Sequence, residues 1–97
     1  MTIPTEVVEQ LKAFEIATVA WCRERKEFVE VVVTPTVIEC EDGNIWVSAE
    51  DGKYLADYYG EVTGGYPYIN EHLEKFAKDR GMFWEWQDPG TISLHYV

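Results

Sequence analysis

Residues 36–50, TVIECEDGNIWVSAE, carry the clearest fold signal in this chain. Apolar and polar side chains alternate on both sides of Asp42-Gly43, and this dipeptide between alternating stretches is the strongest short-range indication of a β-hairpin. With these two residues as the loop, Glu39 pairs with Trp46 across the turn. The stretch therefore predicts a tight hairpin within an antiparallel sheet.

This pairing divides the hairpin into two faces, because successive strand residues point to opposite sides of a sheet. The core face would hold Ile38, Cys40, Ile45, Val47 and Ala49. The outer face would hold Glu39, Glu41, Trp46, Ser48 and Glu50. The two sets match across the turn, and a slip of one residue in either strand would exchange its faces.

The second half predicts a helix followed by another hairpin. Asn70 is a preferred N-cap residue and Gly81 a typical stop, so a helix is expected between them. Its buried stripe would be Leu73, Phe76 and Ala77. Residues 82–86 and 91–96 would form strands around Asp88-Pro89-Gly90, in a type II turn that needs a positive φ at Gly90.

The first third of the chain allows two interpretations. Apolar residues at helical spacing favour one helix from Thr5 to residues 23–26: Val7, Leu11, Phe14, Thr18 and Trp21. Residues 17–22 could instead form a strand. The valine-rich run 28–34 predicts a strand, with Glu30 on the acidic face and three residues on the core face: Val29, Val31 and Val33.

Residues 53–59 predict a short helical segment, and residues 60–69 a loop that contains Gly64-Gly65. Together the elements predict a single domain, 1–97, of the α+β class: an antiparallel sheet of two hairpins with helices packed on one face. A chain of 97 residues has the size of one domain with a modest core.

The net charge of −10 is confined to the middle of the chain. Residues 1–26 and 75–97 are each neutral overall, residues 27–52 carry seven acids and no base, and residues 53–74 carry a net charge of −3. A concentrated negative field selects basic partners and disfavours direct binding to DNA, RNA or anionic lipid. The expected partner is therefore a protein that itself binds nucleic acid.

Glu39 and Glu41 are two residues apart on the predicted outer face, so their Cβ atoms would lie about 7 Å apart. Phosphates two nucleotides apart on one DNA strand have about this axial spacing. Such a ladder could imitate a phosphate backbone, or it could be a solvated face that keeps the sheet soluble. The predicted partner-binding residues are the acids of this region and Trp46 as a candidate anchor: Glu30, Glu39, Glu41, Asp42, Trp46, Glu50, Asp51, Asp57 and Glu61.

Signals for catalysis and for metal binding are weak. A catalytic carboxylate pair needs a cleft that perturbs a pKa, and an exposed sheet face offers none. The two Glu-Asp-Gly sequences, at 41–43 and 50–52, lack the spacing of an EF-hand loop and fit tight turns. No nucleophile motif accompanies the histidines or the cysteines, and two reduced, buried thiols are expected: Cys22 and Cys40. We expect no enzyme activity, no cofactor and no metal.

The second half resembles small uncharacterised proteins of phages and mobile elements. The residues that carry this resemblance are Tyr58-Tyr59-Gly60-Glu61, Gly64-Gly65-Tyr66-Pro67-Tyr68-Ile69, Trp84-Glu85-Trp86 and Pro89-Gly90. In size, acidity and its start at Thr5–Glu9, the chain is also similar to phage-borne anti-CRISPR proteins of the type I-F class. This resemblance implies a mimic of duplex DNA that occupies the DNA-binding cleft of a guide-RNA surveillance complex.

The sequence and the resemblance together predict a non-enzymatic, phage-type inhibitor that acts as a monomer. The opening residues MTIPTEVVEQ lack the features of a signal peptide and no apolar stretch is long enough to span a membrane, so the cytoplasm of the bacterial host cell is expected. One alternative is a small enzyme or ligand-binding module with an aromatic pocket under the loop 60–68. Another is a homodimer that pairs through Trp46 or an edge strand.

Overall fold

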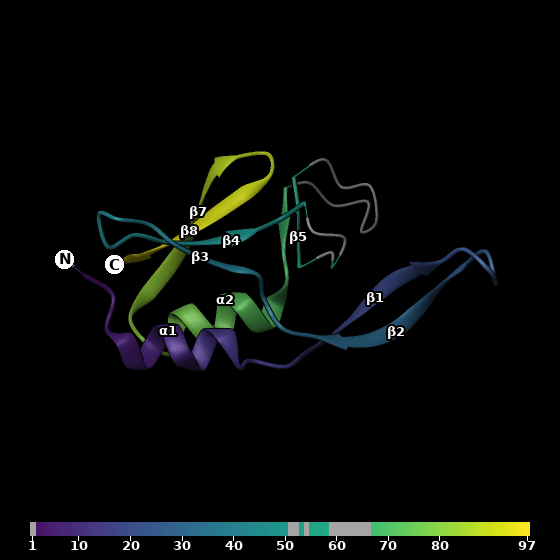
Figure 1. Cartoon of the computed structure of the whole chain (residues 1–97), viewed down its shortest axis with the longest axis horizontal. Helices are drawn as coiled ribbons and strands as arrows, with labels where there is room; N and C mark the ends of the chain where they lie inside the picture. The colour runs from purple at the N-terminus through teal and green to yellow at the C-terminus, as the bar shows by residue number, and fades with distance from the viewer. Residues whose placement is uncertain (1, 51–52, 54, 59–66) are drawn as a thin grey trace.

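The computed structural model describes residues 2–50, 53, 55–58 and 67–97 (Figure 1). In chain order its elements are α1 (Thr5–Lys12), β1 (Ile16–Cys22), β2 (Glu27–Val33), β3 (Val37–Glu39), β4 (Ile45–Ser48), β5 (Ala56–Asp57), β6 (Tyr68–Ile69), α2 (Glu71–Lys78), β7 (Met82–Asp88) and β8 (Thr91–Tyr96). A four-stranded antiparallel sheet has the order β3-β4-β8-β7, while β1 pairs with β2 and β5 with β6 in two smaller sheets. The predicted α+β class, with a sheet built from two hairpins, is confirmed.

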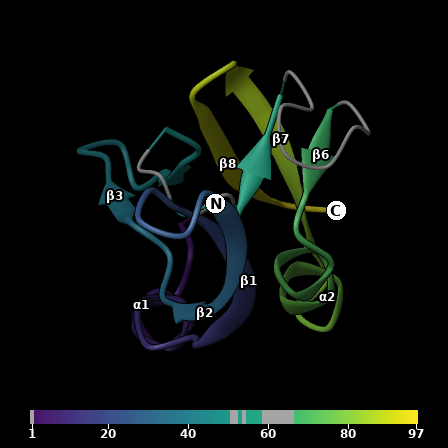
Figure 2. The same cartoon turned by 90° about the vertical axis from the view of Figure 1, so that its right-hand side faces the viewer.

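Both helices lie on the same side of the four-stranded sheet (Figure 2). The inner face of that sheet contributes buried apolar side chains from three strands: Ile45, Val47, Met82, Trp84, Ile92 and Leu94. The helices contribute Val8, Leu11, Leu73, Phe76 and Ala77. This layer of helices over one sheet face lets each element bury its apolar side against the other.

Helix α2 begins and ends where the sequence predicts. The Asn70 side chain accepts a hydrogen bond from the backbone N–H of His72 at 2.8 Å, which satisfies a free N–H group of the first turn. Gly81 follows the helix with a φ of +70°, a conformation that favours glycine. The indole N–H of Trp84 donates to the Leu73 carbonyl at 2.7 Å, so a buried hydrogen bond ties α2 to β7.

The predicted hairpin of β7 and β8 is confirmed, but the type II turn is wrong. Gly90 does not adopt the positive φ that this turn requires. Instead, the Asp88 carboxylate accepts a hydrogen bond from the backbone N–H of Gly90 at 2.8 Å. Aspartate favours turns through this kind of local bond.

The single helix predicted from Thr5 to residues 23–26 is wrong, and the alternative strand is right. Helix α1 ends at Lys12, and Trp21 lies in β1. Phe14 fits the helical spacing for a different reason: it follows the helix and packs on Phe76, with ring centroids 5.2 Å apart. Branched side chains at the start of β1 favour an extended conformation over a helix.

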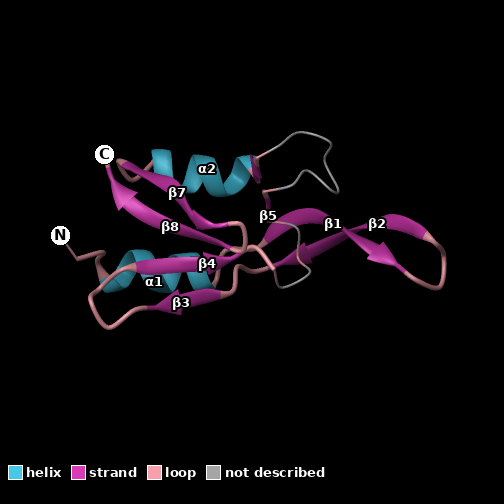
Figure 3. Cartoon of the chain, turned by 90° about the horizontal axis from the view of Figure 1, so that it is seen from above, coloured by secondary structure: helices cyan, strands magenta, loops and turns pink. Residues whose placement is uncertain are grey.

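Strands β1 and β2 form a hairpin, the arm (residues 16–33), which projects from the rest of the chain (Figure 3). The strand predicted at 28–34 is confirmed as β2, but it pairs with β1 and not with the main sheet. Val33 at the base of the arm packs against the core, whereas Val29 and Val31 are half-buried further out. The expectation that all three valines face the core is therefore wrong for the outer part of the arm.

The short helix predicted at 53–59 is also wrong. Strand β5 pairs with β6, so that Ala56 lies opposite Ile69. Leu55 and Ala56 are buried, which places this segment in the core as an extended chain. Most of the predicted loop 60–69, with Gly64-Gly65, lies outside the described residues.

Candidate protein-interaction face

The hairpin of β3 and β4 differs from its predicted register by one residue. Ile38 pairs with Trp46, and the loop has three residues instead of two. The backbone N–H of Cys40 donates to the Asn44 carbonyl at 2.9 Å, and Gly43 has a φ of +88°. Three-residue hairpin loops commonly combine a type I turn with a left-handed residue, and Gly43 is suited to that position.

This slip inverts the predicted faces of β3 but leaves those of β4 unchanged. Ile38, predicted to be in the core, is 43% exposed, and Cys40 is half-buried. Ile45 and Val47 are buried as predicted, with Trp46 on the opposite face. Because side chains alternate along a strand, one added loop residue is enough to exchange the faces of a neighbouring strand.

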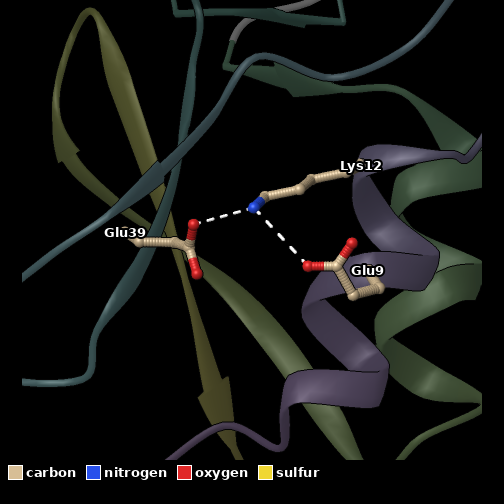
Figure 4. A network of polar contacts seen from close by, with 3 residues as sticks. All are labelled: Glu9, Lys12 and Glu39. Carbon is tan, nitrogen blue, oxygen red and sulfur yellow. Dashed lines mark hydrogen bonds and ion pairs between the residues drawn. The ribbon is translucent and has the colours of Figure 1, made fainter.

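Glu39 faces helix α1 rather than an acidic ladder. Its carboxylate lies 2.8 Å from the Nζ of Lys12, which is also 3.7 Å from the carboxylate of Glu9 (Figure 4). The hydrogen bond that Lys12 donates to Glu39, reinforced by the charges of both carboxylates, raises the pKa of Lys12 above its ordinary value of 10.5. Glu39 therefore connects the edge strand to α1, and the predicted ladder of Glu39 and Glu41 along β3 is wrong.

The face of the four-stranded sheet opposite the helices is the open face. Its side chains are Ile38, Trp46, Ser48, Phe83, Glu85, Gln87, Thr91, Ser93 and His95. One row of paired residues crosses all four strands, from Ile38 through Trp46 and Ser93 to Glu85. With strands about 4.8 Å apart, the row is about 14 Å long.

The centre of the open face is held by hydrogen bonds around Ser93. Its hydroxyl accepts a hydrogen bond from the Gln87 amide at 2.5 Å and lies 2.7 Å from Nε2 of His95. The His95 ring is tilted against Phe83, with ring centroids 5.6 Å apart. Phe83 is 41% exposed. The hydrogen-bonded centre is therefore surrounded by three large apolar side chains: the half-buried Trp46 and the exposed Phe83 and Ile38.

The predicted acids lie around this face and do not form a row on it. Glu41 and Asp42 occupy the β3–β4 turn, where the Asp42 carboxylate accepts from the backbone N–H of Asn44 at 3.0 Å. Glu50 lies beyond the other end of β4, and its carboxylate packs against Gly90. Asp88 bonds to the same glycine, so two carboxylates converge on the β7–β8 turn.

Two of the other predicted acids lie on different elements. Glu30 is exposed on the arm, and Asp57 lies half-buried in β5. Asp51 and Glu61 lie outside the described residues. The structure therefore brings Trp46 to an outward face with acids at both ends of β4, but it does not gather the described members of the predicted set into one site.

Sequence reasoning missed the contributions of Ile38, Phe83 and His95 to the open face. A signal for Phe83 was present in the alternation of Met82-Phe83-Trp84-Glu85. Phe83 and Glu85 are two residues apart and therefore lie on the same face of the strand, which the charge of Glu85 indicates is the outer one. Ile38 could not be found in this way, because its face depends on the length of the turn.

A cavity of about 580 Å³ lies between α2 and β7. Its lining residues are mostly charged: Glu74, Lys75, Lys78, Asp79, Met82 and Phe83. The hydrogen bond from Lys75 at 2.7 Å lowers the pKa of Asp79 below its ordinary value of 3.8. This shift keeps the carboxylate ionised, whereas a general acid needs a raised pKa.

Among the described residues, no group of three or more His, Cys, Asp or Glu side chains is placed to hold a metal ion. The two cysteines are free thiols. The aromatic pocket considered under the loop 60–68 falls largely outside the described residues, although burial and then the charge of Glu71 raise the pKa of Tyr68.

Comparison of the chain with models of protein families, with curated proteins and with solved structures found no match. In the part of the chain that the structure describes, neither helix has the length and apolar character needed to cross a bilayer.

Proposed function

We propose that the chain is a non-enzymatic inhibitor that mimics double-stranded DNA and binds a basic nucleic-acid-binding protein in its place. One observation carries this proposal: the described acids of residues 27–50, a stretch without bases, are exposed, and most of them form no ion pair. Glu30, Glu41, Asp42 and Glu50 form no ion pair with any base in the described residues, unlike Glu27 and Glu39. The specific partner suggested by the resemblance is a type I-F CRISPR surveillance complex.

The overall charge is weaker than that of a duplex. DNA carries one negative charge per about 1.7 Å of its axis, whereas a net charge of −10 along a 45 Å molecule amounts to about one per 4.5 Å. The field is therefore suited to steering the encounter with a basic cleft, which depends on complementary potential. It does not by itself explain a tight complex.

The open face supplies the contacts that would hold such a complex. Protein interfaces are stabilised mainly by a few apolar or aromatic residues near the centre, surrounded by a polar rim. Trp46 lies in the central row beside the exposed Ile38. The rim acids lie beyond the two ends of β4: Glu41 and Asp42 in the β3–β4 turn, and Glu50 after the strand. In this proposal, the rim acids meet groups that otherwise contact phosphates, while Trp46 anchors the complex.

The test is a competition measurement with a purified type I-F surveillance complex and a labelled target duplex. The chain should release the duplex, and this effect should weaken as salt rises from about 50 to 200 mM, because screening reduces attraction between exposed charges. Duplex and chain bound to the complex at the same time would contradict the proposal.

Two double variants with the same change of charge separate local contacts from the overall field. Glu41→Lys with Glu50→Lys alters the rim of the open face, whereas Glu15→Lys with Glu74→Lys alters exposed acids elsewhere. The rim variant should lose competition much more than its control. Trp46→Ser should mainly speed dissociation, because losses of buried contacts act on the off-rate.

A further inference from the structure

The arm presents an apolar face whose large side chains are partly exposed. Residues paired across the arm share a face, and one side consists of Ala17, Val19, Trp21, Phe28, Glu30 and Val32. Val32 is 65% exposed, and Trp21 and Phe28 are each 47% exposed. The two aromatic rings meet edge to face with centroids 5.1 Å apart. This side is the arm's outer face.

A hairpin with this surface benefits from a cover. An isolated pair of strands is at best marginally stable in water, and the arm projects well beyond the helices and the main sheet (Figures 1 and 3). Burying the exposed halves of its aromatic rings would add apolar area to what the arm already buries.

The tip of the arm is basic and would therefore favour contact with an acidic surface. Residues 23–26, Arg-Glu-Arg-Lys, are all exposed and carry a net charge of +2. The net charge of −10 therefore leaves −12 on the rest of the chain. Lys26 has a φ of +53°, a conformation that glycine or asparagine adopts more readily, so a base occupies a position where backbone geometry favours another residue.

We propose that a second copy of this chain packs on the arm's outer face, and that the basic tip contacts the acidic surface of that copy. The apolar face supplies a self-complementary contact, and the tip supplies the charge that opposes repulsion between two acidic molecules. This inference is independent of the proposed inhibitor function, because it uses the arm and not the open face.

The size of the arm explains why both parts are needed. A stable interface buries about 800 Å² on each partner. An aromatic side chain buries about 150–250 Å² in all, and the two on the outer face are already half covered. The outer face alone falls short of a stable interface, so contact by the tip is required to complete it.

The test measures the mass of the full chain by sedimentation across a wide range of protein concentration. The wild type should form dimers. Trp21→Ser should weaken dimerisation by about 30-fold or more, as expected for a central aromatic contact. The triple variant Arg23→Glu, Arg25→Glu and Lys26→Glu should abolish dimerisation at the same concentrations. Phe83→Ser, which removes a similarly exposed ring from the open face, is the matched control and should dimerise normally.

Three results would overturn the inference: a wild type that stays monomeric throughout, a dimer that survives both arm variants, or a dimer lost in the Phe83 control. Far-ultraviolet circular dichroism of each variant must match the wild type for a loss of dimer to be assigned to the interface. Binding of a labelled single-stranded DNA that depends on the tip bases, without dimers, would assign the tip to nucleic acid instead. A monomer that still displaces duplex would refute the arm dimer and leave the proposed function standing.

Discussion

The arm and the β7–β8 hairpin are both antiparallel pairs of long strands, yet they are buried very differently. In β7–β8, helix α2 covers one side, so Trp84 and Leu94 are 7% and 2% exposed. In the arm, Ile16 at the base is buried, whereas Trp21 near the tip is 47% exposed. Alternation along a strand determines which residues share a face. A covering element decides whether that face becomes core.

The largest expected contrast is between two aliphatic truncations, one in each hairpin. Leu94→Ala should lower the free energy of unfolding by about 2–5 kcal/mol, because it leaves a cavity in a packed core. Val32→Ala should change it by no more than about 0.5 kcal/mol. Urea denaturation of both variants at a concentration where the chain is monomeric tests the contrast, and equal losses would break it.

The second contrast compares the same substitution at two tryptophans. Trp84→Phe removes the indole that donates to the buried Leu73 carbonyl at 2.7 Å, and such a hydrogen bond contributes about 0.5–1.5 kcal/mol to stability. Trp21→Phe removes no hydrogen bond that the structure shows and should have a much smaller effect on stability. Denaturation midpoints that fall equally would show that the arm is as tightly packed as the core.

The comparison extends to β3, where neighbouring residues lie on opposite faces. Ile38→Ala should change the free energy of unfolding by about 0.5 kcal/mol or less, because the side chain is 43% exposed. Glu39→Lys should lower the thermal midpoint slightly, since the new ammonium would face Lys12. A loss of about 2–5 kcal/mol for Ile38→Ala would support the two-residue turn and its register.

The smallest effect concerns alkaline pH. The folded-state pKa of Lys12 is raised above 10.5, so its contribution to stability is complete below that value and is lost as pH rises through the raised pKa. Glu39→Gln removes the main cause of the shift. Thermal midpoints of wild type and variant should therefore converge at alkaline pH. Tyr68, whose pKa is also raised, contributes to both proteins and cancels in the comparison.

Local chemistry explains which elements the sequence predicts well. The start of α2 depends on the amide of Asn70 and its end on Gly81, and both signals act within one helical turn. The β7–β8 turn likewise depends on Asp88 and its neighbours. These features do not require knowledge of distant contacts, and their positions are correct even though the turn type is not.

Longer-range contacts explain the failures. Asp-Gly suits hairpin loops of two or three residues. The three-residue loop that forms here places Ile38 on the outer face and Glu39 next to Lys12. The apolar helical spacing extends from α1 to Phe14 because that ring packs on α2 from a non-helical segment. Such effects matter most for the candidate site. The outward position of Trp46 follows from the alternation along β4 itself, whereas the predicted acidic ladder depended on the register of β3.

The four tryptophans occupy separate environments, and this gives the molecule its own optical reporters. Trp21 marks the arm, Trp46 the open face, Trp84 the core, and Trp86 a contact with Tyr58 whose ring centroids lie 5.3 Å apart. Variants that each retain one indole would let acrylamide quenching of fluorescence follow one region at a time. A neutral quencher is needed, because a net charge of −10 would repel iodide. Protection of Trp21 on self-association, and of Trp46 on binding a basic partner, would distinguish the two surfaces.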